Sequence, residues 1–213
     1  MTVWAIVVAA GRGERFGGPK QLEVVAGKRV LDWSVEAARA ACDGVVVVVP
    51  SGAEPGPSGR LSGERRDVEG GDTRSESVRN GLAAVPDDAE VIVVHDAARP
   101  LATDALFEQV IASVLAGAAA AVPGVAVSDS LREIDGGVVD RGRVVAVQTP
   151  QAFRADLLRR AHRDEPDASD DATLVEMIGG KVEIVPGETT NFKITTSHDL
   201  KVARMLVAEE SAS

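Results

Sequence analysis

The sequence predicts an α/β fold with a mostly parallel, twisted sheet and helices on both faces. Apolar runs such as Trp4–Ala10 and Val45–Val49 lack the alternation of a half-buried strand, so they suit strands buried on both sides. Segments with the apolar spacing of helices separate these runs. Strand and helix alternate almost throughout the 213 residues, which is typical of right-handed crossovers within one domain.

The first half of the chain contains three strand–helix units. The strand at Trp4–Ala10 ends in a glycine-rich loop, and a helix is expected over Lys28–Cys42, with its apolar residues on one face. Val45–Val49 is the second strand. The third is Val91–Val94, followed by a helix that Thr103 caps and that ends near Ala116, with Gly117 as its stop.

Between the second and third strands lies a stretch rich in turn residues. Pro50–Gly63 contains many Gly, Pro and Ser residues and is expected to be a flexible surface loop. A second glycine turn, at Gly70 and Gly71, leads into a helix that Ser75 or Ser77 could cap.

The second half begins with a strand at Ala118–Val122 and a hairpin. Two strands, over 125–134 and 138–147, flank the turn sequence Asp135-Gly136-Gly137. The last helix is expected to begin at a Ser197 cap and to bury Leu200, Ala203 and either Met205 or Leu206. The remaining expected elements are helices around Ala155–His162 and Asp170–Ile178, strands at Val182–Val185 and Phe192–Thr195, and a frayed end over Ala208–Ser213.

Composition excludes several classes of function. A formal net charge of −10 argues against nucleic acid or an anionic membrane as the main partner. Cys42 is the only cysteine, so an intrachain disulfide and a cysteine-rich zinc site are both excluded, and we expect it to be a core residue. No apolar run approaches the length of a membrane span, and the N-terminus does not resemble a signal peptide. We therefore expect a cytoplasmic protein.

The loop after the first strand predicts an anion site. Four glycines fall between Gly11 and Lys20, and Arg12, Arg15 and Lys20 bring positive charge to the same loop. Backbone N–H groups and cations together suit a chain of phosphates. The loop is not the dinucleotide fingerprint, because Phe16 replaces the third glycine, and the residues around Pro19 do not match a P-loop.

Asp96 is the candidate metal ligand. It follows an apolar strand, so its carboxylate can lie at the same edge of the sheet as both glycine turns. A carboxylate beside polyphosphate needs a divalent cation between them, and Mg²⁺ is the usual choice. The alternative is a structural ion pair between Asp96 and Arg99. Lys193 is expected on a late strand, either facing the site or solvated at a sheet edge.

The sequence contains no Ser/His/Asp arrangement or paired-carboxylate motif, so no covalent nucleophile is indicated. Phosphoryl-type transfer needs none, because its catalysis is mostly positioning and charge neutralisation. An attacking phosphate is already anionic at neutral pH and requires no general base.

These motifs resemble those of the 2-C-methyl-D-erythritol 4-phosphate cytidylyltransferase family. The resemblance runs from Val3 to about Arg204 and rests on AAGRGERF, PKQ, GGDTR followed by SV, VHDAARP, TPQ before Phe153, and NFKIT. It implies a Rossmann-like nucleotidyltransferase fold and transfer of CMP from CTP to a polyol phosphate with Mg²⁺.

The resemblance also implies roles for individual residues. Arg15, Lys20 and Lys193 would be catalytic, with Lys193 on the opposite side of the α-phosphate, and Asp96 would lie at the metal. Nucleotide-binding residues would be Ala9, Ala10, Gly11, Gly13, Gly71, Asp72, Ser77 and Asp96. Substrate-binding residues would be Asp96, Arg99, Ser130, Arg141, Ser169 and Asp170.

The segment 125–147 resembles the family's projecting arm, an appendage of the single domain 1–213. This implies a homodimer in which Ser130 and Arg141 reach the partner's site. A two-stranded ribbon is marginal alone, which also favours a partner. The alternatives are a cytidylyltransferase for ribitol or another polyol phosphate, a sugar-1-phosphate nucleotidyltransferase, and a non-catalytic nucleotide-binding regulator.

Overall fold

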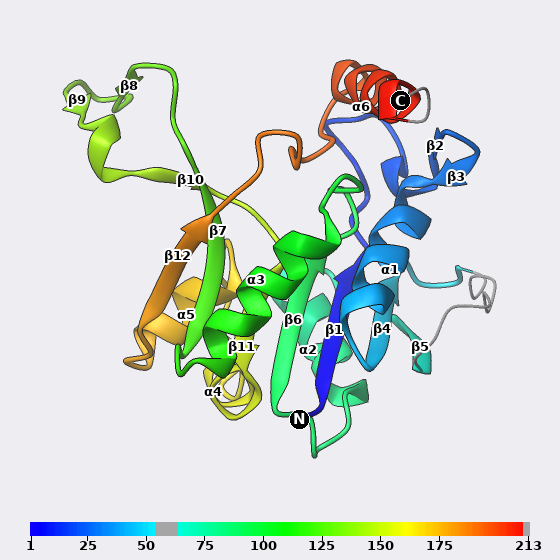
Figure 1. Cartoon of the computed structure of the whole chain (residues 1–213), viewed down its shortest axis with the longest axis vertical. Helices are drawn as coiled ribbons and strands as arrows, with labels where there is room; N and C mark the ends of the chain where they lie inside the picture. The colour runs from blue at the N-terminus through cyan, green and yellow to red at the C-terminus, as the bar shows by residue number, and fades with distance from the viewer. Residues whose placement is uncertain (54–63, 211–213) are drawn as a thin grey trace.

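An eight-stranded mixed sheet forms the centre of the protein in a computed structural model, which describes residues 1–53 and 64–210 (Figure 1). Its strands are β1 (Val3–Val8), β4 (Gly44–Val49), β5 (Glu64–Glu69), β6 (Val91–Asp96), β7 (Ala120–Ala126), β10 (Val145–Val147), β11 (Gln151–Arg154) and β12 (Val182–Pro186). The strand order is β10-β7-β11-β6-β1-β4-β5, and β12 pairs with β7. β1, β4, β5 and β6 pair in parallel, as does β12 with β7, whereas β10 and β11 run antiparallel to their neighbours. The predicted α/β class is confirmed.

Helices cover both faces of the sheet. α1 (Val30–Ala41) and α3 (Asp104–Leu115) pack on one face, and α2 (Arg74–Ala84), α4 (Ala155–Ala161) and α5 (Asp171–Met177) pack on the other. In β1, Ala5 and Val7 contact the first group, while Trp4 and Ile6 contact the second. Both faces of β1 are therefore buried, which explains why its sequence shows no polar alternation.

A third apolar cluster joins the C-terminal helix α6 (Ser197–Glu210) to the small hairpin of β2 (Val24–Val25) and β3 (Lys28–Arg29) (Figure 1). Val25, Ile194 and Ala203 are fully buried within it. The short 3-10 helix η1 (Lys20–Leu22) precedes the hairpin. This cluster holds the segment that contains Lys193 against the body of the protein.

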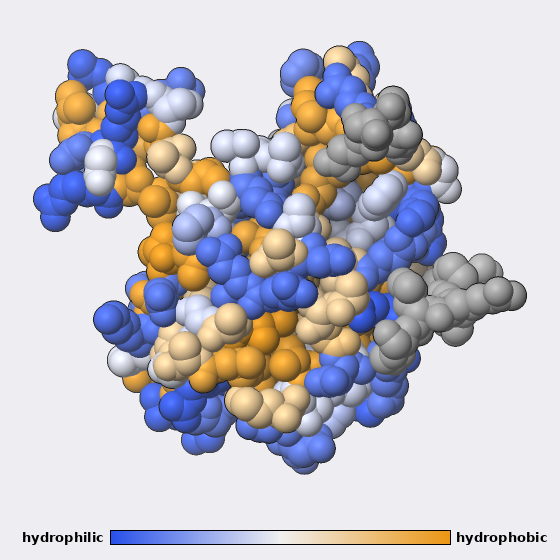
Figure 2. Space-filling view, viewed as in Figure 1, coloured by the Kyte–Doolittle hydropathy of each residue, from blue (hydrophilic) through white to orange (hydrophobic). Residues whose placement is uncertain are grey.

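An arm projects from the sheet, as predicted for 125–147 (Figures 1 and 2). Its base is the antiparallel pair of β7 and β10, and its tip pairs β8 (Leu131–Arg132) with β9 (Val138–Val139), followed by the 3-10 helix η2 (Arg141–Arg143). The tip ladder is only two residues long in each strand, so the predicted strands over 125–134 and 138–147 were too long. Ile134 at the tip is fully exposed.

Two strands of the central sheet were not predicted from the sequence, and one predicted strand does not form. β5 has the sequence ERRDVE and lies at the sheet edge, so its charged residues obscured it. β11 is a four-residue antiparallel strand between β6 and β7. Phe192–Thr195 is an irregular segment, anchored by Ile194, whose N–H donates to the carbonyl of Ala98. The predicted loop Pro50–Gly63 lies mostly outside the described residues.

Several helix ends also differ from the predictions. Thr73 caps α2 by accepting a hydrogen bond from the N–H of Glu76, so the prediction of Ser75 or Ser77 was wrong. Thr196, not Ser197, bonds to the first turn of α6. Thr103 caps α3 as predicted.

The predicted burial of Leu200 and Ala203 on α6 is confirmed. Of the two alternatives beside them, Met205 is 64% exposed and Leu206 is half-buried, whereas Val207, which was not predicted, is buried. Within residues 1–53 and 64–210, every helix is too short or too polar to cross a membrane.

Candidate active site

A cavity of about 420 Å³ opens where β1, β5 and β6 end. The glycine-rich loop after β1, the Gly71 turn after β5 and the end of β6 all line it, so the three predicted loops do meet at one edge of the sheet. The predicted site residues that line it are Ala9, Ala10, Gly11, Gly13, Arg15, Lys20, Gly71, Asp72, Ser77, Asp96 and Lys193.

The glycine-rich loop lines this cavity and contains backbone N–H groups that make no hydrogen bond to the described residues. The carbonyl of Gly13 accepts hydrogen bonds from the N–H groups of Phe16, Gly17 and Gly18, which closes the loop into a tight turn. In the described part of the chain, no N–H of residues 11–15 donates a hydrogen bond. These donors can therefore bind an anion, as the sequence predicts.

Gly13 is required for the shape of this loop. Its φ is +67°, and a Cβ there would lie 1.9 Å from the carbonyl oxygen of Gly18. Any side chain at this position would force the loop open.

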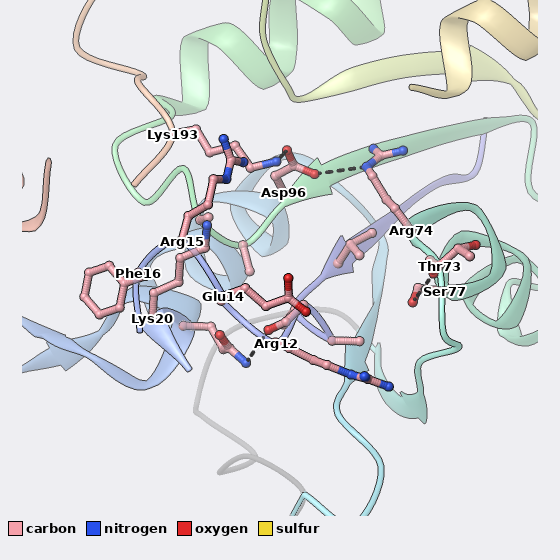
Figure 3. A pocket seen from close by; sticks show the side chains of 18 of the residues that line it. Arg12, Glu14, Arg15, Phe16, Lys20, Thr73, Arg74, Ser77, Asp96 and Lys193 are labelled. Carbon is pink, nitrogen blue, oxygen red and sulfur yellow. Dashed lines mark hydrogen bonds and ion pairs between the residues drawn. The ribbon is translucent and has the colours of Figure 1, made fainter. Parts of the chain in front are cut away.

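Cations from two distant parts of the chain meet in the cavity (Figure 3). Partial burial lowers the pKa of Lys20, and the nearby charges of Lys193 and Arg15 lower it further. Like charges are held together here at an electrostatic cost, which a bound polyanion would remove.

Asp96 is the last residue of β6, and its carboxylate lies between two cations (Figure 3). Its Oδ1 is 3.3 Å from Nε of Arg74, and its Oδ2 is 2.7 Å from Nζ of Lys193. Burial alone would raise the pKa of Asp96, but Arg74 and Lys193 outweigh burial and hold it well below its usual value. Asp96 is therefore ionised at neutral pH.

Arg99 does not form the alternative ion pair with Asp96. Its guanidinium donates to the carbonyl of Asn191 at 2.8 Å and also contacts the carbonyl of Val147. Burial lowers its pKa, and the charge of Asp96 offsets part of that effect. Arg99 therefore joins the loop before Lys193 to the base of the arm.

His95 holds the turn that follows Asp96. The Thr149 hydroxyl accepts the N–H of Asp96 at 3.0 Å, so its own hydrogen is free to donate to Nδ1 of His95, 3.1 Å away. Nε2 of His95 then carries the proton and donates to the carbonyl of Arg99 at 3.2 Å. Burial lowers the pKa of His95 to about 4, consistent with this neutral form.

Arg74 also lines the cavity, and no role was predicted for it from the sequence. Besides Asp96, it contacts Asp171 on α5 through Nη1, at 2.7 Å. The only signal in the sequence for a role of Arg74 was its place in the GGDTR motif. Its partners Asp96 and Asp171 lie 22 and 97 residues away in the sequence.

Five other predicted residues are not among the described residues that line the cavity: Arg99, Ser130, Arg141, Ser169 and Asp170. Ser130 and Arg141 lie on the exposed arm, where Arg141 donates to the carbonyl of Ser128. Asp170 caps α5, with Oδ1 2.9 Å from the N–H of Thr173. Their predicted contacts with substrate remain predictions.

A metal ion at this site would bind Asp96 without the support of a ligand cluster. Residues 1–53 and 64–210 contain no group of three or more His, Cys, Asp or Glu side chains that could hold a metal. Mg²⁺ is commonly bound by one or two carboxylates together with substrate phosphates, so a single ionised Asp96 beside a phosphate loop fits that mode.

Comparisons with known proteins agree with this site. The sequence model described as "IspD: 2-C-methyl-D-erythritol 4-phosphate cytidylyltransferase" matches residues 3–209. An enzyme of that name from Rhodococcus opacus is 43% identical, over 97% of this chain and 96% of its own length. Among solved structures, the cytidylyltransferase of that name from Thermus thermophilus has a TM-score of 0.84 and 39% identity, over 98% of this chain and 100% of its own.

Some similar proteins are longer than this chain. The bifunctional IspDF from Campylobacter jejuni has a TM-score of 0.83 and 28% identity, over 94% of this chain and 54% of its own length.

Proposed function

The chain belongs to the 2-C-methyl-D-erythritol 4-phosphate cytidylyltransferase family, and from this premise we propose that it transfers CMP from CTP to 2-C-methyl-D-erythritol 4-phosphate. An oxygen of the substrate phosphate attacks the α-phosphorus, and the bond from that phosphorus to the oxygen bridging to the β-phosphate breaks. The products are 4-diphosphocytidyl-2-C-methyl-D-erythritol and pyrophosphate. The observation that carries the proposal is the convergence of Arg15, Lys20 and Lys193 on a cavity with free backbone donors.

The proposed mechanism is charge neutralisation and positioning. The attacking phosphate is already an anion, so no residue has to remove a proton. Arg15 and Lys20 lie on the glycine loop and would bind the triphosphate, while Lys193 would approach the α-phosphate from another segment. Loss of repulsion among these cations would favour the bound state.

Mg²⁺ would be held by Asp96 together with phosphate oxygens of CTP. When bound, it would supply positive charge that neutralises the triphosphate. The low pKa of Asp96 supports this role, because the carboxylate is ionised before any metal arrives.

Cytosine would bind at the Gly71 side of the cavity. A second hollow lies beside the first and shares Ala10, Arg12, Gly71 and Asp72 with it. The N–H of Gly71 donates to the hydroxyl of Ser77, which fixes the backbone there. A base in this hollow would be selected by backbone groups.

The arm would serve a homodimer. Its exposed apolar residues, Ile134 and Val138, would pack on a second copy, and Ser130 and Arg141 would reach the substrate phosphate in that copy's site. Ser169 and Asp170 would contact the same substrate. The single domain over 1–213 with its arm at 125–147, and the cytoplasmic location, belong to the same proposal.

Pyrophosphate release tests the function. It should be measured with CTP, UTP, ATP and GTP, each against methylerythritol 4-phosphate and ribitol 5-phosphate. We expect release with CTP and methylerythritol 4-phosphate only. Preference for ribitol phosphate would establish that alternative, and nucleotide binding without any release would indicate a regulator.

A further inference from the structure

Arg74 connects the cavity to a chain of charged side chains behind it. Five side chains lie in contact one after another, in the order Lys193, Asp96, Arg74, Asp171 and His162. The donor–acceptor distances of the four successive contacts are 2.7, 3.3, 2.7 and 3.0 Å. These side chains come from five separate segments. Figure 3 shows the cavity end of this chain, with Arg74 and Lys193 on either side of Asp96.

The burial of these groups sets Arg74 apart from a surface arginine. The side chain of Arg74 is 23% exposed, that of Asp96 11% and that of Asp171 1%. Removing charges from water is costly unless each is paired in good geometry. The guanidinium meets this condition at two of its nitrogens, because Nε contacts one carboxylate and Nη1 another, while Nη2 has no hydrogen-bond partner among the described residues.

We propose that Arg74 is a positioning residue that fixes the orientation of the Asp96 carboxylate. By holding Oδ1, it leaves Oδ2 to face Lys193 and the cavity. Asp171 in turn holds the guanidinium in place. This inference rests on the proposed function, because it concerns the carboxylate that would bind the metal and the lysine that would bind the α-phosphate.

Arg74 also maintains the charge balance of Asp96. If Lys193 moves to a phosphate, Asp96 loses its partner on Oδ2 but keeps Arg74 on Oδ1. The carboxylate then remains ionised and fixed, with one oxygen available to Mg²⁺. A lysine at position 74 would keep the positive charge but could not bridge two carboxylates in the same way.

The surrounding structure does not depend on Arg74 alone. The segment before α5 is tied to α2 by other hydrogen bonds: Thr73 to Asp167, Ser75 to both backbone groups of Ala168, and Arg79 to Pro166. The packing of α5 near α2 should therefore survive Arg74→Lys, so that the variant tests positioning rather than folding.

The experiment compares Arg74→Lys with the matched control Arg79→Lys. Both arginines lie on α2 and contact the segment 166–171, but Arg79 is not among the described residues that line the cavity. For each variant, the measurements are kcat, the Mg²⁺ concentration for half-maximal rate, the melting temperature, and the calorimetric Kd for CTP with Mg²⁺ and with EDTA.

We expect Arg74→Lys to lower kcat and to raise the Mg²⁺ concentration for half-maximal rate, each by ~10–100-fold, as for other residues that orient metal ligands. CTP binding in EDTA should stay within about threefold of wild type, because the glycine loop is untouched. Arg79→Lys should match wild type in all four measurements. Asp171→Asn should shift the Mg²⁺ requirement in the same direction, and adding it to Arg74→Lys should cause little further loss, because both act through Asp96.

Three results would overturn the inference. The first is an unchanged Mg²⁺ requirement in Arg74→Lys. The second is a loss of CTP affinity in EDTA as large as the loss with Mg²⁺, which would mean that Arg74 binds the nucleotide directly. The third is that Arg79→Lys lowers kcat and raises the Mg²⁺ requirement as much as Arg74→Lys does. If Arg74→Lys does not fold, Asp171→Asn decides by the same criteria. The binding measurements remain informative even if wild type releases no pyrophosphate, so failure of the proposed function would be seen separately.

Discussion

His95 should make the protein lose stability as the pH falls from about 7 to about 4. Its ring is fully buried, and burial lowers its pKa from 6.5 to about 4. In the unfolded chain the ring binds a proton below pH 6.5, whereas the folded protein excludes that proton until about pH 4. The stability that the neutral His95 ring contributes is therefore fully present above pH 6.5 and is lost as the pH falls towards 4. At about 1.4 kcal/mol for each pH unit, the loss is about 3 kcal/mol.

The assay is urea unfolding of wild type and His95→Gln between about pH 7.5 and pH 4. The variant should be less stable at the upper end of this range, because the hydrogen bonds to Thr149 and Arg99 are disturbed, but its stability should fall by about 3 kcal/mol less over the range. Carboxylates titrate in both proteins, so the difference isolates His95. Parallel curves, or a His95 ring that titrates near its ordinary pKa by NMR, would refute the neutral buried histidine.

Three further predictions concern the site. Lys20→Ala should lower kcat by ~10²–10³-fold, as when a donor to the transition state is lost, and a loss below about tenfold in a steady-state assay would remove Lys20 from the mechanism. Gly13→Ala should weaken CTP binding in calorimetry, because its Cβ would meet the carbonyl of Gly18, and unchanged affinity would contradict the loop as the phosphate site. Arg141→Ala should raise KM for the polyol phosphate and leave the Kd for CTP unchanged; a weaker Kd for CTP would contradict its assignment to the substrate phosphate.

Residues with strong local patterns were predicted correctly. The five consecutive valines of β4 favour a buried strand, and the glycines and cations that predict the anion site lie within ten residues after β1. Asp96 was placed at the cavity because a strand's end fixes where the next side chain lies. These predictions depend on neighbours in sequence, which the sequence displays directly.

The features that were missed depend on contacts between distant residues. β5 forms because β4 offers an open edge, not because ERRDVE favours a strand. Lys193 was predicted at the site, but its ion pair with Asp96 was not, because it forms from an irregular segment held by the burial of Ile194. The bridge from Arg74 to Asp171 joins residues 97 positions apart, and nothing near either residue indicates the other.

In the proposed mechanism, the triphosphate of CTP lies between the cations of the glycine loop and Lys193. A crystal structure with a non-hydrolysable CTP analogue and Mg²⁺ tests it most directly. We expect the triphosphate in the 420 Å³ cavity, with Arg15 and Lys20 within hydrogen-bond distance of its oxygens and Lys193 at the α-phosphate. A triphosphate bound elsewhere, away from all three side chains, would contradict it.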